Sequence, residues 1–534
     1  MKRIYLLFIA CVFAMVSFAQ GYSEEQLESL TDSIYTNPEY VINWADNAIK
    51  KNSKCSDAYL LKACVFINEK DYLKALELLK RSLKFVSKQS VYSKSSILSI
   101  RCGLYYQVGD FDLALADITE AIKINPKDLV PYEYRISLYK KLGQYENAEQ
   151  DCRKLLTLND SLSYKLELVN VLVYQEKTEE ALGIVNNIIK YQPKEVLPYA
   201  TRSWVLANIG NYEDSINDYL QFIALGGDYA LDHLVELSEN NYDYTINKLS
   251  NLIITDENKN TWLGVRARLY IEAEEYDLAL SDLNLLVELI NNETIFTLYH
   301  KYLCYDGLSN YLKQVEVLTK LIDIQEKPDS YALAMRGVAY ENLADFEKAI
   351  NDLNSSLAIE PDNYLNYLRR GWIYEKYGDF EKALKDYDTS IILGPNLPIT
   401  RLKRAQILLE AKDTLKATED LKIVLELDSV SNIRAFALVL LGNEEEAIDF
   451  MNSKLEKELN KSNLYDLACI YSLANRKEEA IDTLGKAVKL GYKNYNHIKY
   501  DRDFINIREE QGFKDILASM NQAKVLKLFE GFGK

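Results

Sequence analysis

A short pattern of apolar and polar positions recurs along the chain: a small residue, a polar residue, an aromatic residue, two variable residues, and then alanine or serine. Clear copies start at Gly109, Gly143, Gly210 and Gly378, and a looser copy starts at Ala344. The last position of the pattern recurs most often after 34 residues, at Ala75, Ala114, Ala148, Ala181, Ser215, Thr245, Ala279, Gln314, Ala349, Ala383, Ala417, Ala447 and Ala480. A period of this length predicts thirteen stacked copies of one supersecondary unit.

Each copy predicts two helices joined by a tight turn. The glycine supplies the left-handed residue that ends the first helix, and the polar residue after it caps the second. Proline stops the second helix twelve residues after the alanine in four copies, at Pro126, Pro193, Pro361 and Pro395. Two shorter spacings of 30 residues, which end at Thr245 and Ala447, predict copies that lack one helical turn.

The composition supports an all-helical chain larger than one domain. The 534 residues include only 20 Gly and 9 Pro, about 5% of the chain, whereas an average protein has roughly 12%. Such a shortage of turn formers argues against a β-sandwich or β-barrel. Because 48% of the residues are apolar and 27% are charged, the chain is not intrinsically disordered either.

The copies resemble the tetratricopeptide repeat family. That family has a small residue, an aromatic residue, an alanine and a proline at fixed positions, and Gly337, Tyr340, Ala349 and Pro361 match this order. The resemblance covers about residues 55–491. It implies an all-α fold, a right-handed superhelical α-solenoid of helix-turn-helix repeats.

The remaining segments have separate expected roles. Residues 20–54 are expected to form a degenerate helical repeat or cap before the thirteen units of 55–491. Residues 492–534 resemble the tail that closes many bacterial proteins of this class. The last helix pair of a solenoid exposes an apolar face, and we expect this tail to cover it.

The N-terminus has the pattern of a secretory signal peptide. Lys2 and Arg3 precede an apolar run, and the triplet Ser17-Phe18-Ala19 predicts cleavage after Ala19, so 1–19 is the expected signal peptide. An uncleaved anchor and a lipoprotein attached at Cys11 are the alternatives. We expect an exported protein without a transmembrane segment after cleavage, periplasmic or envelope-associated in a Gram-negative bacterium.

An arginine recurs in the first helix of the unit. Eight of the 17 arginines occupy one repeat position, and seven of these have an aspartate sixteen residues later. The pairs are Arg101 and Asp117, Arg135 and Asp151, Arg202 and Asp218, Arg266 and Asp282, Arg336 and Asp352, Arg370 and Asp386, and Arg404 and Asp420. The unit without the arginine has Leu168 and Ile184 instead, and the eighth arginine, Arg434, has Asp449 after fifteen residues. We interpret the pairs as structural contacts between the two helices of a unit; a ladder of ligand-binding arginines is the alternative.

Charge and motifs exclude several functions. A formal net charge of −17 repels phosphate backbones and anionic lipid, so nucleic-acid binding is not expected. The three histidines are isolated and the seven cysteines form no metal-ligand spacing, so we expect no metal and no cofactor. No catalytic motif occurs and every spacing between units is accounted for, so no enzyme activity is expected.

The resemblance implies a concave groove lined by the first helices, which holds peptides or helices of partner proteins. Aromatic and arginine side chains dominate binding hot spots, and the groove positions include Tyr106, Trp204, Arg268, Tyr299, Trp372 and Phe436. Padding between adjacent repeats is the alternative role for each of them. Arg369 and Lys403 form the nearest basic cluster, but their positions do not match the clamp with which some family members hold a C-terminal carboxylate.

These features favour a non-catalytic interaction scaffold of the cell envelope whose groove binds a segment of another protein, of unknown identity. The alternative is a glycan-binding protein of an outer-membrane nutrient-uptake system, with aromatic side chains as platforms for sugars. Such proteins usually carry a lipid anchor and long loop-rich insertions, and we expect neither feature here.

Overall fold

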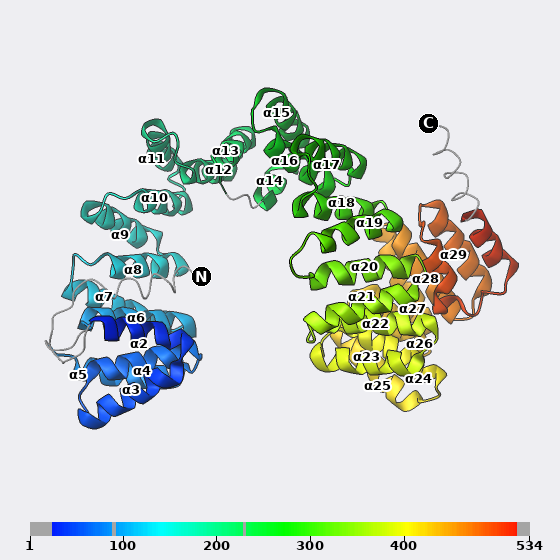
Figure 1. The fold of residues 1–534 in the computed structure, drawn as a ribbon, viewed down its shortest axis with the longest axis horizontal. Coiled ribbons are helices and arrows are strands. Elements are labelled where there is room, and N and C mark those ends of the chain that lie inside the picture. Colours follow the sequence, from blue (N-terminus) through cyan, green and yellow to red (C-terminus); the bar gives the residue numbers. More distant parts are fainter. Residues whose placement is uncertain (1–23, 88–91, 228–230, 521–534) are drawn as a thin grey trace. The chain divides into compact units, whose positions relative to one another are not determined.

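Helices account for all regular structure in residues 24–87, 92–227 and 231–520, which are the residues that this computed structural model describes (Figure 1). No strand occurs in these three ranges. The predicted signal peptide, 1–19, lies outside them. None of the helices in the described ranges is long and apolar enough to cross a lipid bilayer.

The chain divides into two compact units, Met1–Thr245 and Ile246–Lys534. The helices of the first unit are α2 (Glu24–Thr36), α3 (Pro38–Lys51), α4 (Ser56–Asn68), α5 (Tyr72–Phe85), α6 (Lys94–Val108), α7 (Phe111–Ile124), α8 (Leu129–Lys141), α9 (Tyr145–Leu158), α10 (Leu162–Tyr174), α11 (Thr178–Tyr191), α12 (Leu197–Asn208), α13 (Tyr212–Ala224) and α14 (Leu231–Ser238). Helix α15 (Tyr242–Thr255) contains the boundary between the units.

The second unit continues the same alternation of first and second helices. Its helices are α16 (Lys259–Glu272), α17 (Tyr276–Ile290), α18 (Ile295–Gly307), α19 (Tyr311–Asp323), α20 (Ser330–Asn342), α21 (Phe346–Ile359), α22 (Tyr364–Tyr377), α23 (Phe380–Leu393), α24 (Pro398–Glu410), α25 (Thr414–Leu427), α26 (Asn432–Leu440), α27 (Glu444–Lys457), α28 (Lys461–Leu473), α29 (Lys477–Lys489) and α30 (Tyr495–Tyr500), followed by the 3-10 turn η2 (Arg502–Phe504).

Small residues lie where the two helices of most pairs meet, with Gln314 of α19 as the exception. Every residue at the last position of the recurring pattern, from Ala75 to Ala480, falls in a second helix and is at most 2% exposed. A larger side chain there would push the paired helices apart, because protein interiors are close-packed. The buried apolar side chains form clusters within a pair and between neighbouring pairs, as expected of a solenoid.

The turns inside the pairs use left-handed residues, as the glycine pattern predicts. Gly109 and Gly378 have φ of 83° and 89°, and the backbone N–H groups there donate to carbonyls of the preceding helix. In several other pairs a residue with a side chain holds this position, for example Ala344 at φ 62° and Lys412 at φ 64°. The left-handed turn is therefore a property of the repeat, whether or not glycine is present.

The helix boundaries follow the remaining signals. Asp110 and Asp379 cap the second helices α7 and α23 by accepting hydrogen bonds from backbone N–H groups three residues later. The two copies with the short spacing have the short first helices α14 and α26, of 8 and 9 residues. The missing turn was therefore removed from the first helix of each of these copies.

Candidate functional site

The seven arginine–aspartate pairs form two-point contacts between the first and second helices of a unit. In each pair the arginine Nε and Nη2 donate to the two aspartate oxygens at 2.6–2.8 Å, as between Arg101 and Asp117. The aspartate side chains are 3–10% exposed. These arginines are held inside the repeat, which leaves them little capacity to bind a ligand.

The free Nη1 of most of these arginines contacts the preceding unit. Arg202 donates to Asn186 Oδ1 at 2.7 Å, and Arg404 contacts Asp388 at 2.6 Å. The pairs therefore tie successive repeats together as well as the two helices of one repeat. Arg434, the eighth arginine at this repeat position, forms no such two-point contact. Its guanidinium lies 3.7 Å from the Glu446 carboxylate rather than against Asp449.

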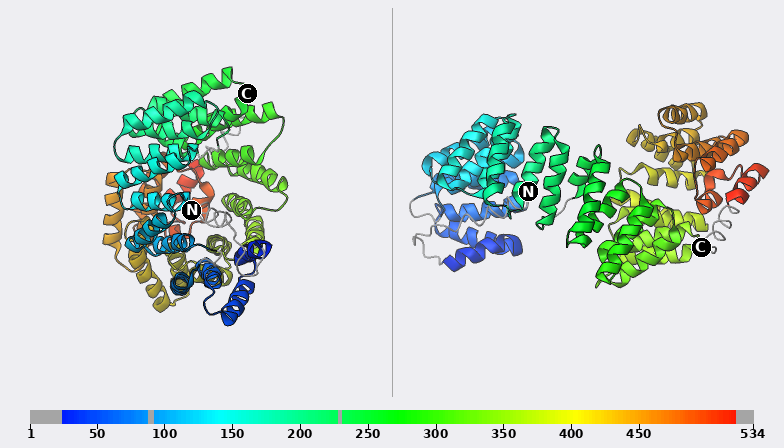
Figure 2. Two further views of the ribbon diagram at one scale, coloured as in Figure 1. Left: turned by 90° about the vertical axis from the view of Figure 1, so that its left-hand side faces the viewer. Right: turned by 90° about the horizontal axis from the view of Figure 1, so that it is seen from above.

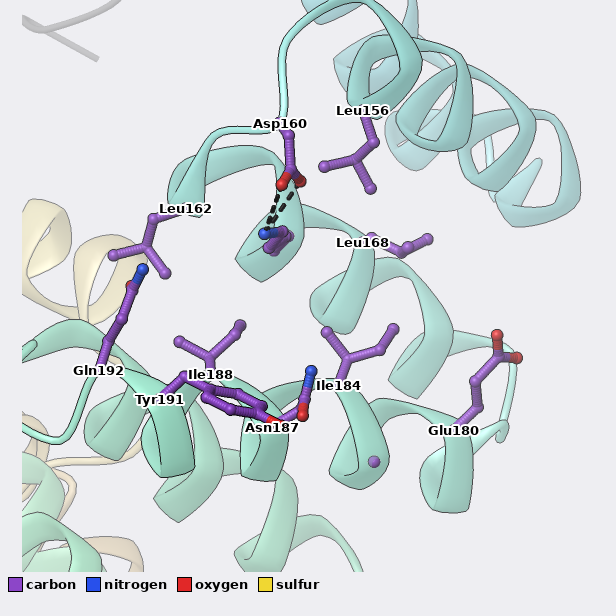
Figure 3. Close-up of a pocket in the computed structure, with 12 residues that line it drawn as sticks. Leu156, Asp160, Leu162, Leu168, Glu180, Ile184, Asn187, Ile188, Tyr191 and Gln192 are labelled. Atoms are coloured by element: carbon purple, nitrogen blue, oxygen red, sulfur yellow. Dashed lines mark hydrogen bonds and ion pairs between the residues drawn. The ribbon is translucent and has the colours of Figure 1, made fainter.

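An open groove with a mixed polar and apolar lining lies where the ladder of pairs is interrupted, in the first unit (Figure 3). Leu168 on α10 and Ile184 on α11 face this groove from the positions that arginine and aspartate hold elsewhere. Its volume is about 660 Å³, and at its rim Lys165 and Asp160 form an ion pair at 2.9 Å. The groove thus coincides with the loss of one charged pair.

Two of the expected groove residues lie in the first unit. Trp204 on α12 is partly buried and packs against Tyr174, with 5.8 Å between the ring centroids. Tyr174 is 53% exposed and stacks on Tyr145 at 5.1 Å, so these three rings form a continuous aromatic row. Tyr106, the other residue, contacts the edge of the Phe111 ring at 5.6 Å.

In the second unit the C-terminal part of the chain lies on the first helices. We call residues 492–508 the closing segment. At its start Asn494 donates to Asn342 Oδ1 on α20 at 2.6 Å, and near its end Asp503 accepts from Gln406 on α24 at 2.8 Å. Figures 1 and 2 draw these orange-to-red elements beside the green and yellow helices of the same unit.

Trp372 on α22 is one of the residues that the closing segment contacts. The His497 ring meets its indole ring edge to face, with 6.3 Å between the centroids. The ammonium groups of Lys376 and Lys403 lie 5.0 and 5.1 Å from the centroid of the same indole ring. Trp372 therefore already packs with partners from its own chain.

Phe436 on α26 is covered in a similar way. Its side chain is partly buried and packs against the apolar cluster that joins α28 and α29 to the closing segment. That cluster includes Phe504 and Phe513, which are 0% and 1% exposed. Phe436 therefore contributes to the apolar anchor of the C-terminal part of the chain.

Several charged side chains are buried or partly buried where the closing segment meets the helices of the second unit. Asp501 accepts a hydrogen bond from Tyr465 Oη at 2.6 Å, and Arg502 lies 3.4 Å from Glu375. Burial, together with the nearby Asp501 carboxylate, raises the pKa of Asp503 to about 7. The positive charge of the buried Lys403 ammonium opposes this rise. Asp503 and Glu375 in turn raise the pKa of Lys403.

Cys469, Asp501 and Asp503 are the described residues with the best geometry for a metal ion, with ligand atoms within 4.8 Å of one another. Both carboxylates already accept hydrogen bonds from the protein, and burial raises the pKa of the Cys469 thiol well above its ordinary value. A thiol that stays protonated is a poor metal ligand. This arrangement suits an internal polar network better than a metal centre.

The first helices α18 and α20 carry a second aromatic site. We call Tyr299, Tyr302 and Tyr331 the tyrosine cluster. The centroid of the Tyr299 ring lies 6.2 Å from that of Tyr302 and 6.4 Å from that of Tyr331. Tyr302 is 5% exposed, whereas Tyr331 is 46% exposed and faces solvent. The tyrosine cluster thus combines a buried base with an open edge.

The charges of two arginine side chains act on the tyrosine cluster. The charge of Arg268 on α16 acts on Tyr299, and the charge of Arg369 on α22 interacts with Tyr331 and Tyr302. Arg268 lies 3.8 Å from Glu272 on its own helix. Arg268 and Tyr299 are two of the expected groove residues.

The sequence does not predict that the closing segment covers some first helices of the second unit and leaves the tyrosine cluster open. The sequence marks Arg369 as part of a basic cluster with Lys403, whereas the structure associates Arg369 with the tyrosine cluster and Lys403 with Asp503. Nothing in the polar residues of the closing segment distinguishes a segment that crosses the first helices from one that only caps the last pair. That placement depends on contacts over more than one hundred residues of sequence, such as Asn494 with Asn342.

Comparison with known proteins identifies repeats of one family. The family model described as "Tetratricopeptide repeat" matches residues 103–128, 137–161, 330–363 and 462–491. These matches fall on the helix pairs α6–α7, α8–α9, α20–α21 and α28–α29.

Curated relatives are distant. A TPR repeat-containing protein of Methanocaldococcus jannaschii is 24% identical over 86% of this chain and 80% of its own length. Proteins named DnaJ homolog subfamily C member 7 homolog, from Schizosaccharomyces pombe and Dictyostelium discoideum, are 22% and 25% identical. The chain spans 64% and 39% of these two relatives, less than two thirds of either.

Solved structures with a similar trace include yeast Tom70, with 15% sequence identity, a TM-score of 0.36, and coverage of 89% of this chain and 96% of that chain. The APC/C hetero-tetramer Cut9–Hcn1 matches with 13% identity, a TM-score of 0.31, and coverage of 80% and 96%. MamA matches with 19% identity, a TM-score of 0.29, and coverage of 31% and 93%.

Proposed function

We propose that this chain, which is an all-α solenoid of tetratricopeptide repeats, is a non-catalytic scaffold that binds a segment of another protein on its first helices. The fold supports the general role, because stacked helix pairs form extended surfaces for protein partners. Contacts of the closing segment and exposed aromatic rings on the first helices support the location of the binding surface.

The closing segment is the observation that carries the proposal. Residues 492–508 lie on first helices of the second unit and use side-chain amides, an aromatic contact and ion pairs to stay there. This surface therefore has the chemistry to hold a polypeptide. First helices that are not covered in this way offer the same kind of surface to a segment of another protein.

The aromatic row of the first unit is the part of that surface we assign to a partner. Trp204 and Tyr174 are partly exposed rings on adjacent first helices, α12 and α10. Rigid aromatic rings bury much area on binding at a low cost in conformational entropy. We expect them to anchor an apolar side chain of the partner segment.

A capture experiment with matched variants tests this assignment. The full chain would be compared with the double variant Trp204→Ala and Tyr174→Ala, and with Tyr40→Ala as the control. Tyr40 is 50% exposed near the start of α3, so its loss changes an exposed ring outside the aromatic row. We expect the captured proteins to be lost with the double variant and kept with the control. Identical capture by all three proteins would contradict the assignment.

Glycan binding, the alternative function, has less support at Trp372. A sugar platform needs a free aromatic face, and this indole already contacts His497 and two lysine ammonium groups. The aromatic row of the first unit keeps exposed ring surface, so a glycan array probed with the Trp204→Ala variant separates the two functions.

We also propose that the chain is exported and acts in the cell envelope. This rests on the basic residues, apolar run and Ser17-Phe18-Ala19 triplet at the N-terminus. N-terminal sequencing of the protein from its native cells tests it, and the expected first residue is Gln20. A chain that retains Met1 in the soluble cytoplasmic fraction would contradict export.

A further inference from the structure

Successive first helices of the second unit meet at a recurring pair of side chains. Glu341 on α20 forms an ion pair with Lys376 on α22, and these two residues are 35 positions apart. One repeat later the same two positions hold Glu375 on α22 and Glu410 on α24. The lysine of the first junction is therefore a glutamate at the second, so that two carboxylates take the place of an ion pair.

The closing segment supplies the missing positive charge. Nη1 of Arg502 lies 3.4 Å from the Glu375 carboxylate, and Nη2 of the same side chain donates to Glu410. The guanidinium also lies over the Phe380 ring, 4.5 Å from its centroid. Among the residues that the structure describes, Arg502 is the only cation within ion-pair distance of either carboxylate. The repeats thus form a cation site that a side chain from outside them completes.

Glu375 is fixed at the base of this site. Its side chain is 4% exposed, and its Oε2 atom accepts a hydrogen bond from Tyr387 Oη at 2.7 Å. Tyr387 is fully buried and fits against α22 because residue 371 is glycine: a Cβ on Gly371 would lie 2.7 Å from the Tyr387 ring. A buried carboxylate costs free energy unless it is paired. The base of the site therefore requires a cation.

The outer side of the site is open to solvent. The Glu410 side chain is 51% exposed and Phe380 is 39% exposed, whereas the Arg502 side chain is 19% exposed. A guanidinium that arrives from solvent can reach both carboxylates once Arg502 has moved away. Arginine suits the site better than lysine, because a planar guanidinium can donate to two carboxylates and stack on an aromatic ring at the same time.

We propose that Glu375, Glu410 and Phe380 form a subsite for an arginine side chain of a partner segment, and that Arg502 occupies this arginine subsite until the partner displaces it. The inference rests on the proposed function, and it adds a contact surface in the second unit and the side chain that this surface recognises. The net charge of −17 attracts basic segments from a distance. Because Arg502 belongs to the same chain, it competes at a high effective concentration and excludes weakly binding segments.

Selection from a peptide library tests the arginine subsite with the full chain as bait. The probe is a library of random peptides displayed on phage. We expect the peptides that the Arg502→Ala variant selects to carry arginine at one fixed position, because its two carboxylates are then free. The variant Arg502→Ala with Glu410→Lys recreates the junction of Glu341 and Lys376. Its own lysine fills the site, so its peptides are expected to lack this preference.

A matched control removes a different arginine of the second unit. Arg476 forms an ion pair with the Glu445 carboxylate, which is 75% exposed. Water hydrates that carboxylate when the arginine is absent, so Arg476→Ala is expected to select the same peptides as the wild type. Thermal unfolding checks the fold of each variant. Arg502→Ala with Glu410→Lys is expected to unfold at a higher temperature than Arg502→Ala, because the new lysine pairs with Glu375.

The outcomes separate the arginine subsite from the proposed function. Peptides selected by Arg502→Ala without a fixed arginine, or a fixed arginine that persists after Glu410→Lys, would overturn the subsite while binding of a partner segment stands. Selection of no peptide by any of the baits would overturn both. If Arg502→Ala fails to fold, Arg502→Gln replaces it as the bait, because its longer neutral side chain still covers Phe380.

Affinity measurements identify the group that is recognised. A selected peptide is compared with the same peptide in which citrulline, a neutral side chain of the same shape, replaces the arginine. We expect Arg502→Ala to bind the citrulline peptide at least about tenfold more weakly than the arginine peptide. The wild type is expected to bind the arginine peptide at least about tenfold more weakly than Arg502→Ala does. Equal affinities of the wild type and Arg502→Ala would show that Arg502 does not compete for the site, and would overturn the proposal.

Discussion

Arg336 and Asp352 hold each other in a two-point contact, with Nε and Nη2 of the arginine 2.7 and 2.8 Å from the two carboxylate oxygens. The Asp352 side chain is 10% exposed, so its loss would leave a poorly hydrated guanidinium on α20. We therefore expect Asp352→Ala to destabilise the fold by about 2–4 kcal/mol. Replacing both residues by apolar side chains of similar size, Arg336→Met with Asp352→Leu, is expected to cost less, as thermal unfolding will show.

An exposed pair serves as the control for this prediction. Lys313 and Glu316 lie one helical turn apart on α19 with about half of each side chain exposed. Water already hydrates both groups, so Glu316→Ala is expected to cost less than about 1 kcal/mol. If the double apolar variant of the Arg336 pair were the least stable protein of the set, the structural interpretation of the pairs would be wrong.

The interruption of the ladder at Leu168 and Ile184 offers the reverse experiment. Either Leu168→Arg or Ile184→Asp alone places one charge against the apolar floor of the groove, and each is expected to lower the unfolding midpoint. The double variant recreates a pair at the spacing used by its neighbours. It is expected to be more stable than either single variant, and a double variant that merely adds the two losses would show that the pair does not form.

The left-handed turns give a prediction about the backbone. Ala344 holds φ of 62°, a conformation that costs a residue with a side chain about 1 kcal/mol relative to glycine. Ala344→Gly is therefore expected to stabilise the second unit by up to about 1 kcal/mol. The reverse change, Gly378→Ala, is expected to destabilise it by a similar amount, although the space around Gly378 is open. Urea titrations of both variants check the sign, and shifts in the same direction would contradict the argument.

The sequence predicts local features of this fold because each has a local cause. The turn glycines, the capping aspartates and the small residue between paired helices act within one repeat, and Arg336 with Asp352 also stays within one repeat. All of these can be recognised from a period of 34 residues.

The functional site is less predictable because its contacts cross many repeats. Trp372 has the sequence signature of a groove residue, but His497 packs against it from 125 positions later. Arg369 resembles its neighbour Arg370 in sequence, and only the missing aspartate sixteen residues later distinguishes it.

Buried carboxylates in the closing segment and in α28 predict that the stability of the second unit depends on pH. The pKa of Asp503 is raised to about 7 and that of Asp466 to about 6, mainly by burial. A folded-state pKa above the unfolded value means that the contribution to stability is full below about pH 4 and is lost as the pH rises through 6 and 7. We therefore expect the second unit to unfold at a lower temperature at pH 8 than at pH 5.

A variant separates this effect from other titrations. Asp503→Asn removes the group with the raised pKa while keeping an oxygen for the hydrogen bond from Gln406. The difference in unfolding midpoint between pH 5 and pH 8 is expected to shrink in this variant. Asp501, whose pKa is lowered, acts in the opposite direction and loses its contribution only in acid, as the pH falls below about 4. A variant with the full pH dependence of the wild type would assign the effect to other groups.

The closing segment itself is expected to open in two steps. Its apolar anchors Phe504 and Phe513 are almost completely buried, whereas Asn494 and Arg502 hold the segment through polar contacts at its partly exposed edge. Removing the polar contacts lowers the free energy of local opening while Phe504 and Phe513 stay packed, so Asn494→Ala with Arg502→Ala is expected to speed amide hydrogen exchange in residues 494–503. Helices α28 and α29 are expected to keep their protection, because Phe513 still packs against them. Hydrogen exchange read by mass spectrometry distinguishes this from the alternative, in which α28, α29 and the closing segment lose protection together and therefore form one cooperative unit.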